Sequence, residues 1–578
     1  MLTSLLLTAL VSTAASPTLE KPSRFSVVNR GGIWSFVTPQ GQTFWSLGTC
    51  CTDPGTALDK VNPKNPSYTG LKLFSTGHEW GKDAVAKLRS WGFNSLGGWS
   101  DETYLRQLPA SERLPYFKVL HLGAYNKAPY SDIFSKETRD WVYRAAKEQI
   151  PSVKDDPFLV GYFSDNELGW WDGYLFRSYL EMPADSPGRQ ALLGVIKKHY
   201  RNSFTNFQKD WITGAHSFEE LGTKNPPKLR PGQNGVKVVN AWMYAMGDYY
   251  YRLMREAIQK YDSSRLILGD RYCQYYSLPI ALSSAKYIDV ASTNMGADWT
   301  NGDLSKYFLN TLYEATKKPI VISEFYMAAM ENRSGNKNDS GGFPVVQTQR
   351  ERADSFGHNL QQLLENPNVI GAHWFQFYDE PTFGRADGEN YNMGMVDIHG
   401  VQYDEMIAKT KSLDLDKPRK AVRPASKAAV EVPSAPTDAT VSLRNWNKAG
   451  FIVPTSRLPL ADLYAVADKD SLYIGLYAMD YIDEELYVGK KLPAIDRPLL
   501  KLKFAGWKDA VDIRFGGEKQ LPTSSDSRIT VTSVPGLKIT AIAKIPRSLV
   551  TNWKLDAEFF THGRGYRTTW QTLLEPRP

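Results

Sequence analysis

Short apolar runs alternate with longer amphipathic stretches over most of the chain. Helical periodicity fills several of the longer stretches, as in GKDAVAKLRSWG, TRDWVYRAAKEQIPSV and QRERADSFGHNLQQLLEN. The short runs are continuously apolar rather than alternating, as parallel strands buried on both faces require. Eight of them, each with a connection long enough for a helix, predict an α/β fold, a (β/α)8 TIM barrel. They cover residues 44–49, 93–98, 117–123, 158–167, 266–271, 288–294, 319–325 and 369–379.

Two further segments extend this barrel. GGIWSFVTPQGQTFWSLG, before the first strand, predicts a hairpin whose second arm is apolar. The connection between the fourth and fifth strands is long, and RQALLGVIKKHYRNSFTNFQKDWI within it predicts additional helices.

The pattern changes near residue 413. Residues 413–438 are rich in Pro, Ala and Lys without periodicity, which predicts a linker after a barrel domain of residues 17–412. Beyond it, short alternating strands such as SLYIGLYAMD, PLLKLKFAG and LKITAIAKIP are separated by turn residues. Residues 439–578 are therefore predicted to form a C-terminal antiparallel β-sandwich.

The first sixteen residues, MLTSLLLTALVSTAAS, form a short apolar segment that ends in small residues. This predicts a signal peptide over residues 1–16 and a secreted or periplasmic location. No later apolar run is long enough to span a bilayer. The three cysteines, Cys50, Cys51 and Cys273, match neither a disulfide framework nor a zinc site.

Composition narrows the class of partner. The net charge of +7 is spread over 578 residues without a dense basic block outside the linker, so nucleic acid is not expected as a partner. The 31 Tyr and 16 Trp suit carbohydrate, because aromatic rings stack on the C–H faces of sugars. Large aromatic cores explain the same count, and composition alone favours them.

Two predicted strands end in glutamate. Glu167 closes the fourth, in FLVGYFSDNELGWWDG, and Glu324 closes the seventh, in PIVISEF. Active sites of such barrels lie at the C-terminal ends of the strands, so both carboxyls are expected at one mouth. One carboxyl that donates a proton and one that attacks the anomeric carbon, or activates water, are what glycoside hydrolysis needs. Either glutamate alone is equally well explained as half of a structural ion pair with arginine, but both together are not.

Three motifs resemble a known family. GYFSDNELGW, ISEF and GAHWFQFYDEPTFGRADGENYNMGMVD are similar to motifs of the retaining glycosidases of clan A, and in particular to the β-agarases of glycoside hydrolase family 50. The resemblance implies that Glu167 is the acid/base and Glu324 the nucleophile. It also implies that Asn166 bonds the sugar hydroxyl beside the anomeric carbon and that Trp374 forms the sugar platform. A cis peptide bond is expected at Trp374–Phe375.

Other residues at strand ends are candidates for substrate contact, each with an alternative. Trp99 and His121 face substrate, although a hydrogen-bonded core histidine explains His121 as well. Asn294 bonds a sugar or the nucleophile, and Tyr326 donates to the nucleophile or packs. Glu389, Asn390 and Asn392 either bind sugar or hold their loop, and Trp170 and Trp171 either stack on sugar or pack on the inserted helices. Asp270 and Arg271 are predicted to form an ion pair that orients the site. Asp379 and Glu380 are weaker candidates than Glu324 for the nucleophile.

The C-terminal domain resembles carbohydrate-binding modules of family 9, through PLADLYAVADKDSLYIGLYAMD, IDRPLLKLKF and LDAEFFTHGRGYRTTWQ. It either binds sugar through a surface of Trp446, Trp507, Trp553 and Trp570 or supports the barrel, and support is slightly favoured.

The sequence thus predicts a hydrolase of β-linked polysaccharide or its oligosaccharides, with agarose-type galactan as substrate. One alternative is a β-galactosidase or β-glucanase of the same clan, which would have the same catalytic pair. Another is a non-catalytic polysaccharide-binding protein, in which one of the two glutamates would be expected to be lost. A metal-dependent hydrolase needs histidine pairs at strand ends, where only His121 and His373 occur. No metal and no organic cofactor is expected, and no oligomeric state is predicted.

Overall fold

A computed structural model describes residues 24–576, apart from 56–69, 275, 418, 421–428, 447, 481–482, 516–521 and 535–537. The predicted signal peptide, residues 1–16, lies outside the described residues. No helix within the described ranges is both long and apolar enough to cross a membrane.

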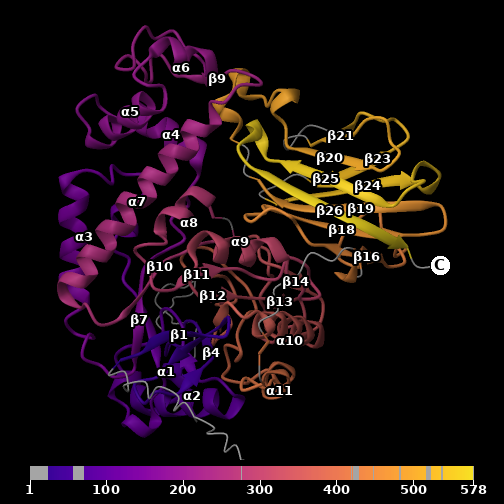
Figure 1. Ribbon diagram of the computed structural model, residues 1–578. Helices are drawn as coiled ribbons and strands as arrows, with labels where there is room; N and C mark the ends of the chain where they lie inside the picture. Colours follow the sequence, from indigo (N-terminus) through magenta and orange to yellow (C-terminus); the bar gives the residue numbers. More distant parts are fainter. Residues whose placement is uncertain are drawn as a thin grey trace, which may run out of the picture.

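A parallel sheet of eight strands forms the larger domain, which confirms the barrel (Figure 1). An isolated bridge from Tyr272 to Thr293 joins its two end strands and completes the circle. Each strand falls on or beside a run predicted from the sequence. In chain order they are β4 (Ser46–Thr49), β5 (Ser95–Leu96), β6 (Tyr116–Val119), β7 (Leu159–Asn166), β10 (Leu266–Arg271), β11 (Ala291–Asn294), β12 (Ile320–Phe325) and β15 (Val369–Trp374).

The barrel interior is filled by apolar side chains, including Phe117, Phe163 and Val321. The predicted N-terminal hairpin is a three-stranded sheet of β1 (Ser26–Arg30), β2 (Ile33–Val37) and β3 (Thr43–Phe44). Its Phe36 is fully buried and packs against Phe117, 5.8 Å between ring centroids. This small sheet therefore closes the barrel interior by extending its core.

Helices cover the outside of the barrel, and their sequences contain the signals that set their ends. Thr348 and Glu351 form a reciprocal capping box at the start of α10. Gly92 ends α2 in the left-handed conformation that glycine adopts most easily. The helices after the strands are α1 (Gly70–Leu73), α2 (Gly77–Trp91), α3 (Lys136–Gln149), α7 (Val236–Tyr261), α8 (Leu278–Ser284), α9 (Lys306–Thr316), α10 (Gln349–Glu365) and α11 (Asp404–Lys411).

The long connection after β7 contains the predicted extra helices. They are α4 (Asp172–Glu181), α5 (Pro187–His199) and α6 (Phe204–Asp210), followed by a small hairpin of β8 (Trp211–Ile212) and β9 (Lys228–Leu229). In Figure 1 this insertion extends away from the barrel and reaches the C-terminal domain. A second pair of short strands, β13 (Ala328–Ala329) and β14 (Val345–Val346), lies after β12.

Two sheets with a shared apolar core form the C-terminal domain, as predicted. The first strand, β16 (Ala429–Val432), lies within the range predicted as linker and pairs in parallel with the last strand, β26 (Arg567–Pro576). One sheet consists of β16, β20 (Leu499–Phe504), β21 (Val511–Arg514), β22 (Thr523–Ser524), β25 (Lys554–Phe560) and β26 (Arg567–Pro576). The other consists of β17 (Phe451–Ile452), β18 (Ala461–Ala467), β19 (Ser471–Met479), β23 (Thr530–Val534) and β24 (Lys538–Pro546).

Buried polar contacts join the two domains. Asp462 of β18 accepts from the backbone N–H groups of Lys306 (2.6 Å) and Tyr307 (2.9 Å), so a carboxylate of the sandwich satisfies the first turn of barrel helix α9. Asp298 of the barrel forms an ion pair with Lys538 of β24. Trp446 and Trp570 are buried within the C-terminal domain. These contacts favour the supporting role over the binding role for this domain.

Candidate active site

Glu167 and Glu324 both stand at the C-terminal end of the barrel. Glu324 lies within β12 and is 6% exposed. Glu167 directly follows β7 with φ of 50°, a left-handed conformation that is uncommon outside glycine. Its N–H donates to the carbonyl of Arg271 at the end of β10, 3.0 Å away. This neighbouring strand therefore holds the backbone turn that carries the Glu167 carboxyl.

Asn294, which ends β11, connects the two glutamate strands. Its amide nitrogen donates to Glu167 Oε1 (3.0 Å) and to Asn166 Oδ1 (3.1 Å). Its amide oxygen accepts from the Ser323 hydroxyl (2.8 Å), one residue before Glu324. The sequence predicts that Asn294 bonds either a sugar or the nucleophile, Glu324. In the structure its amide instead bonds the carboxyl of Glu167.

Arg271 is the second connection, and its side chain is fully buried. One guanidinium nitrogen lies 2.9 Å from Glu324 Oε1 and donates to the Ser323 carbonyl at 2.7 Å. The other donates to Asn166 Oδ1 at 3.1 Å. The contact with Glu324 is an ion pair without hydrogen-bond alignment, and Oε1 has no hydrogen bond from any described residue. One cation thus sits between the ends of β7 and β12.

The electrostatics of Glu324 follow from this burial. Removal from water raises the pKa of its carboxyl to about 8, although the Arg271 charge opposes this, and the negative charge of Glu167 raises it further. A carboxyl with a strongly displaced pKa beside a second carboxyl is typical of a catalytic site. The alternative explanation from the sequence was a structural ion pair with arginine. Within the part of the chain that the structure describes, Glu324 forms such a pair and Glu167 does not.

Tyr326 lies beside the same pair. Burial raises its pKa, and the charges of Glu167 and Glu324 add to this, so its hydroxyl stays protonated. The hydroxyl accepts a hydrogen bond from the Gln274 amide. Because that bond uses an acceptor site, the Tyr326 proton remains available to a group in the mouth.

Trp99 and His121 form one wall of the mouth. The indole N–H of Trp99 donates to His121 Nε2 (3.0 Å), and the Arg271 guanidinium lies 4.2 Å from the Trp99 ring centroid. Burial and the Arg271 charge lower the pKa of His121 to about 4, so the ring is neutral and can accept this bond. Tyr125 stacks on His121 at 4.9 Å and is 69% exposed.

The carboxyl of Asp165 holds this wall in place, a role not recognised from the sequence. It accepts from the N–H groups of Gly123 (2.9 Å) and Ala124 (2.8 Å) and from the Tyr250 hydroxyl (2.6 Å). These bonds fix the loop that carries His121 and Tyr125. These loop hydrogen bonds account for the presence of Asp165. Glu167, two residues later, is the carboxyl that remains as the candidate for a catalytic role.

The loop after β15 contributes Glu389 and Asn390. Glu389 accepts from Arg385 at 2.6 Å, and its negative charge is one of the causes that raise the pKa of Glu324. Asn390 accepts from the backbone N–H groups of Asp339 and Ser340, both at 3.2 Å, so it holds its loop. Asn392 likewise bonds buried loop groups, Asp379 Oδ1 and the Tyr403 hydroxyl.

Trp374 is not placed as the sequence predicted. Its ring has no exposed surface, packs edge-on against Phe325 and Phe356, and donates to the Met393 carbonyl at 2.8 Å. The indole has no free face for a sugar, so the platform role is withdrawn. The cis peptide bond lies one residue later than predicted, at Phe375–Gln376.

One other interpretation is wrong. Asp270 and Arg271 do not pair with each other: Asp270 accepts from the Trp170 indole at 2.9 Å, while Arg271 pairs with Glu324. Trp170 is buried and packs against Tyr250, which supports its packing role over sugar stacking. Asp379 and Glu380 are fully buried and accept loop hydrogen bonds, from Gly394 and Tyr391 respectively.

Within the described residues no cluster of three or more His, Cys, Asp or Glu could hold a metal ion. His373 lies inside the barrel, where its Nε2 is 3.0 Å from the Ser46 hydroxyl, and burial lowers its pKa to about 3. Its neutral ring is thus a core histidine.

Fold and site together define a (β/α)8-barrel protein with two strand-end glutamates joined by an arginine and an asparagine. No family model matches the chain. The chain is 26% identical to β-agarase B of Vibrio sp. (strain JT0107) over 359 residues, which cover 58% of this chain and 36% of that protein. It is also 26% identical to β-agarase A of the same strain over 360 residues, covering 57% and 35%. The chain spans about a third of the length of the curated relatives it matches.

Solved structures agree on the fold. An exo-β-agarase superposes with a TM-score of 0.57 at 22% identity, covering 68% of this chain and 65% of its own. The structure of PfGH50B gives a TM-score of 0.56 at 22% identity, covering 69% and 66%. The resemblance to the β-agarases of glycoside hydrolase family 50 is confirmed by these relatives; the resemblance of the C-terminal domain to family 9 modules stays a prediction.

Proposed function

We propose that the protein is a secreted or periplasmic retaining glycoside hydrolase that cleaves β-linked galactan of the agarose type. The observation that carries the proposal is the pair of glutamates at one barrel mouth, tied to each other through Asn294 and Arg271. The β-agarases among the relatives support the substrate. Other clan A specificities keep the same pair, so a screen of the purified protein on agarose and other β-linked glycans, with chromatography of the products, tests the substrate.

The reaction is a double displacement. Ionised Glu324 attacks the anomeric carbon, the bond to the leaving oxygen breaks, and protonated Glu167 gives that oxygen its proton. Glu167, now ionised, then takes a proton from water as the water oxygen attacks the same carbon. The bond to Glu324 breaks, which restores both carboxyls to their starting states.

The other mouth residues have positioning roles in this scheme. The Asn294 amide orients Glu167 through its 3.0 Å bond, and Arg271 favours the ionised form of Glu324. Asn166 accepts from both Asn294 and Arg271 at Oδ1, which leaves its amide nitrogen to donate to a sugar hydroxyl. The Tyr326 hydroxyl donates a hydrogen bond to the carboxylate of Glu324.

The pH profile tests the role of Arg271. Glu324 must be ionised to attack and Glu167 must be protonated to donate, so kcat/KM should follow a bell-shaped pH profile in which the ionisation of Glu324, whose pKa burial raises to about 8, sets the midpoint of one limb. Arg271→Met removes the cation that favours ionisation, and the midpoint should move to higher pH. Arg271→Lys keeps the positive charge and should shift the midpoint less. Measurement of kcat/KM from about pH 5 to about pH 10 checks this, and equal midpoints in all three proteins would contradict it.

Tyr125 tests whether the exposed wall binds substrate. Tyr125→Ala removes a ring that is 69% exposed and stacks on His121, so KM should rise about fivefold to tenfold with kcat nearly unchanged. Tyr244→Ala, which removes an exposed ring from α7, is the matched control. An unchanged KM on oligosaccharides of all lengths would exclude Tyr125 from binding.

A further inference from the structure

Exposed aromatic rings gather on and beside the segment that follows Glu167. Tyr130, in the loop after β6, is 40% exposed, and Tyr174, in α4, is 43% exposed. Their ring centroids lie 5.7 Å apart in an edge-to-face arrangement. The partly buried Trp171 directly precedes α4 in the same segment. Together Tyr130, Trp171 and Tyr174 form an aromatic ridge.

The ridge is attached to the backbone beside Glu167. The Tyr130 hydroxyl donates to the Gly169 carbonyl at 2.7 Å and accepts from the Trp171 indole N–H. Gly169 has φ of 64°, and a Cβ on it would overlap the Tyr130 hydroxyl. Glycine is therefore needed both for the backbone conformation and for the close approach of the ring. Since Gly169 lies two residues after Glu167, the ridge begins next to the proposed acid/base.

Tyr174 has one ring face open to solvent. The Arg177 guanidinium lies over the ring, 5.5 Å from its centroid, and pairs with Glu485 of the C-terminal domain at 3.1 Å. Lys228 of β9 donates to the Glu485 carbonyl, so Glu485 is joined to two parts of the insertion after β7. Because Arg177 covers one face and the ring is still 43% exposed, the other face of Tyr174 can stack on a ligand.

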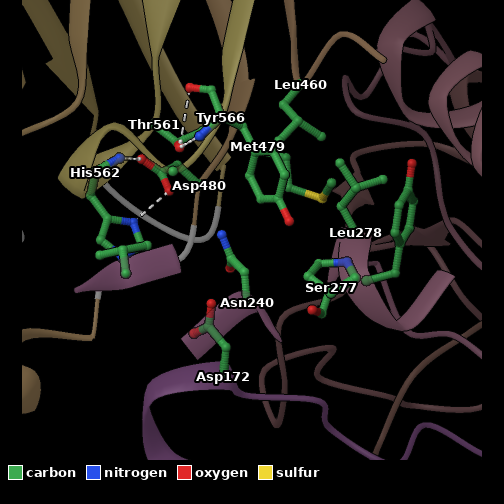
Figure 2. Close-up of a pocket in the computed structure, with 14 residues that line it drawn as sticks. Asp172, Asn240, Ser277, Leu278, Leu460, Met479, Asp480, Thr561, His562 and Tyr566 are labelled. Carbon is green, nitrogen blue, oxygen red and sulfur yellow. Dashed lines mark hydrogen bonds and ion pairs between the residues drawn. The ribbon is translucent and has the colours of Figure 1, made fainter. Parts of the chain in front are cut away.

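The first turn of α4 lies directly against the C-terminal domain. The Asp483 carboxyl packs on Gly173, where a Cβ would overlap it. In Figure 2 Asp172, which begins α4, lies on one side of this boundary, and the ion pair of His562 and Asp480, 2.9 Å long, lies on the other. The cavity between them measures about 40 Å³, which admits only water molecules. The C-terminal domain thus fixes the helix that carries Tyr174.

The position of the ridge decides which part of a sugar chain it meets. In the proposed reaction Glu167 gives its proton to the leaving oxygen, so the sugars beyond the scissile bond lie next to Glu167. The segment from Gly169 to Tyr174 continues outward from this carboxyl. Aromatic rings stack on the C–H faces of sugars, so a chain that leaves the mouth across this segment meets the open rings.

We propose that the aromatic ridge binds the leaving-group portion of a β-linked galactan chain, by stacking of Tyr130 and Tyr174 on sugar residues beyond the scissile bond. This inference deepens the proposed function and rests on it. A chain must extend past Gly169 and Tyr130 to reach Tyr174, so binding improves with chain length. The C-terminal domain contributes to substrate binding by holding the ridge in place, without contacting the sugar through its own tryptophans.

Binding without turnover tests the ridge. Calorimetric titration of Glu324→Ala with agarose-type oligosaccharides of increasing length should show affinity that rises with length. Adding Tyr174→Ala should weaken binding of the longest oligosaccharides about tenfold and leave the shortest unchanged. Tyr174→Phe keeps the ring and should bind as the parent does. Tyr244→Ala, which removes an exposed ring from α7, is the matched control and should also bind as the parent does.

Transfer to an acceptor shows on which side of the scissile bond the ridge acts. A 2-deoxy-2-fluoro-galactosyl group trapped on Glu324 is released when an acceptor hydroxyl attacks the anomeric carbon, Glu167 takes the hydroxyl proton and the bond to Glu324 breaks. Tyr174→Ala should raise the concentration of acceptor oligosaccharide needed for half-maximal release about tenfold, with release by water unchanged.

The outcomes separate this inference from the proposed function. Length-dependent binding that is equal in Tyr174→Ala and Tyr244→Ala would overturn the ridge and leave the proposed function standing. Weaker binding by Tyr174→Ala with an unchanged acceptor concentration would overturn the assignment to the leaving-group side. Absence of binding by Glu324→Ala at every length would contradict the agarose-type substrate itself, and the ridge with it.

Discussion

Glu324→Ala is expected to lower kcat on agarose-type galactan by about 10⁴-fold or more, since removal of a nucleophile removes the first chemical step. The vacated space beside Arg271 should admit azide, because the guanidinium that lies 2.9 Å from the lost carboxylate attracts a small anion. Azide should then attack the anomeric carbon directly and restore part of the turnover. The product should be the α-glycosyl azide, because one displacement inverts a β linkage.

Glutamine at position 324 is the matched control for this result. Glu324→Gln keeps the volume of the side chain and leaves no space for azide, so it should be inactive with or without the anion. Anomeric NMR of the products separates the cases. Full activity of Glu324→Ala without azide would exclude Glu324 as the nucleophile.

In the presence of azide, Glu167→Ala should give a product of the opposite anomeric configuration to that expected from Glu324→Ala. Loss of the proton donor should lower kcat on galactan by about 10²–10⁴-fold, whereas an aryl galactoside with a good leaving group still forms the intermediate at Glu324. Azide, in place of activated water, should then attack that intermediate. Two displacements retain the configuration, so the product should be the β-glycosyl azide.

Asn294→Ala is the companion variant for Glu167. It removes the 3.0 Å bond to Glu167 Oε1 but leaves both carboxyls, so kcat should fall less than in Glu167→Ala and no azide product should form. An α-glycosyl azide from Glu167→Ala would reverse the two assignments. Absence of any azide effect on an activated substrate would contradict the covalent intermediate.

The barrel strands could be predicted from the sequence because each is a short apolar run between helical periods. That same property hides which way each side chain points, since both faces of a parallel strand are buried and apolar. His373 and Trp374 are adjacent on β15 and lie on opposite faces, one inside the barrel and one against α10. The prediction that Trp374 forms the sugar platform was wrong because the sequence does not show to which face of β15 its side chain points.

Alternation along a strand could have corrected another interpretation. Neighbouring residues on a strand point to opposite faces, so Asp270 and Arg271 of β10 could not have paired. Arg271 aligns with Asn166 across β10 and β7, and this register directs its side chain into the mouth. No sequence signal gave the link from Asn294 to Glu167, because it depends on the left-handed backbone at Glu167 and on the spatial order of the strands.

The central claim is that Glu324 forms the covalent bond to the sugar. The most direct test is inactivation by a 2-deoxy-2-fluoro-β-galactosyl fluoride, which slows the second step and traps the intermediate, followed by peptide mapping with mass spectrometry. The account predicts a single label on Glu324 in the peptide containing ISEF. A label on Glu380, Glu389 or any other carboxyl, with Glu324 unmodified, would contradict it.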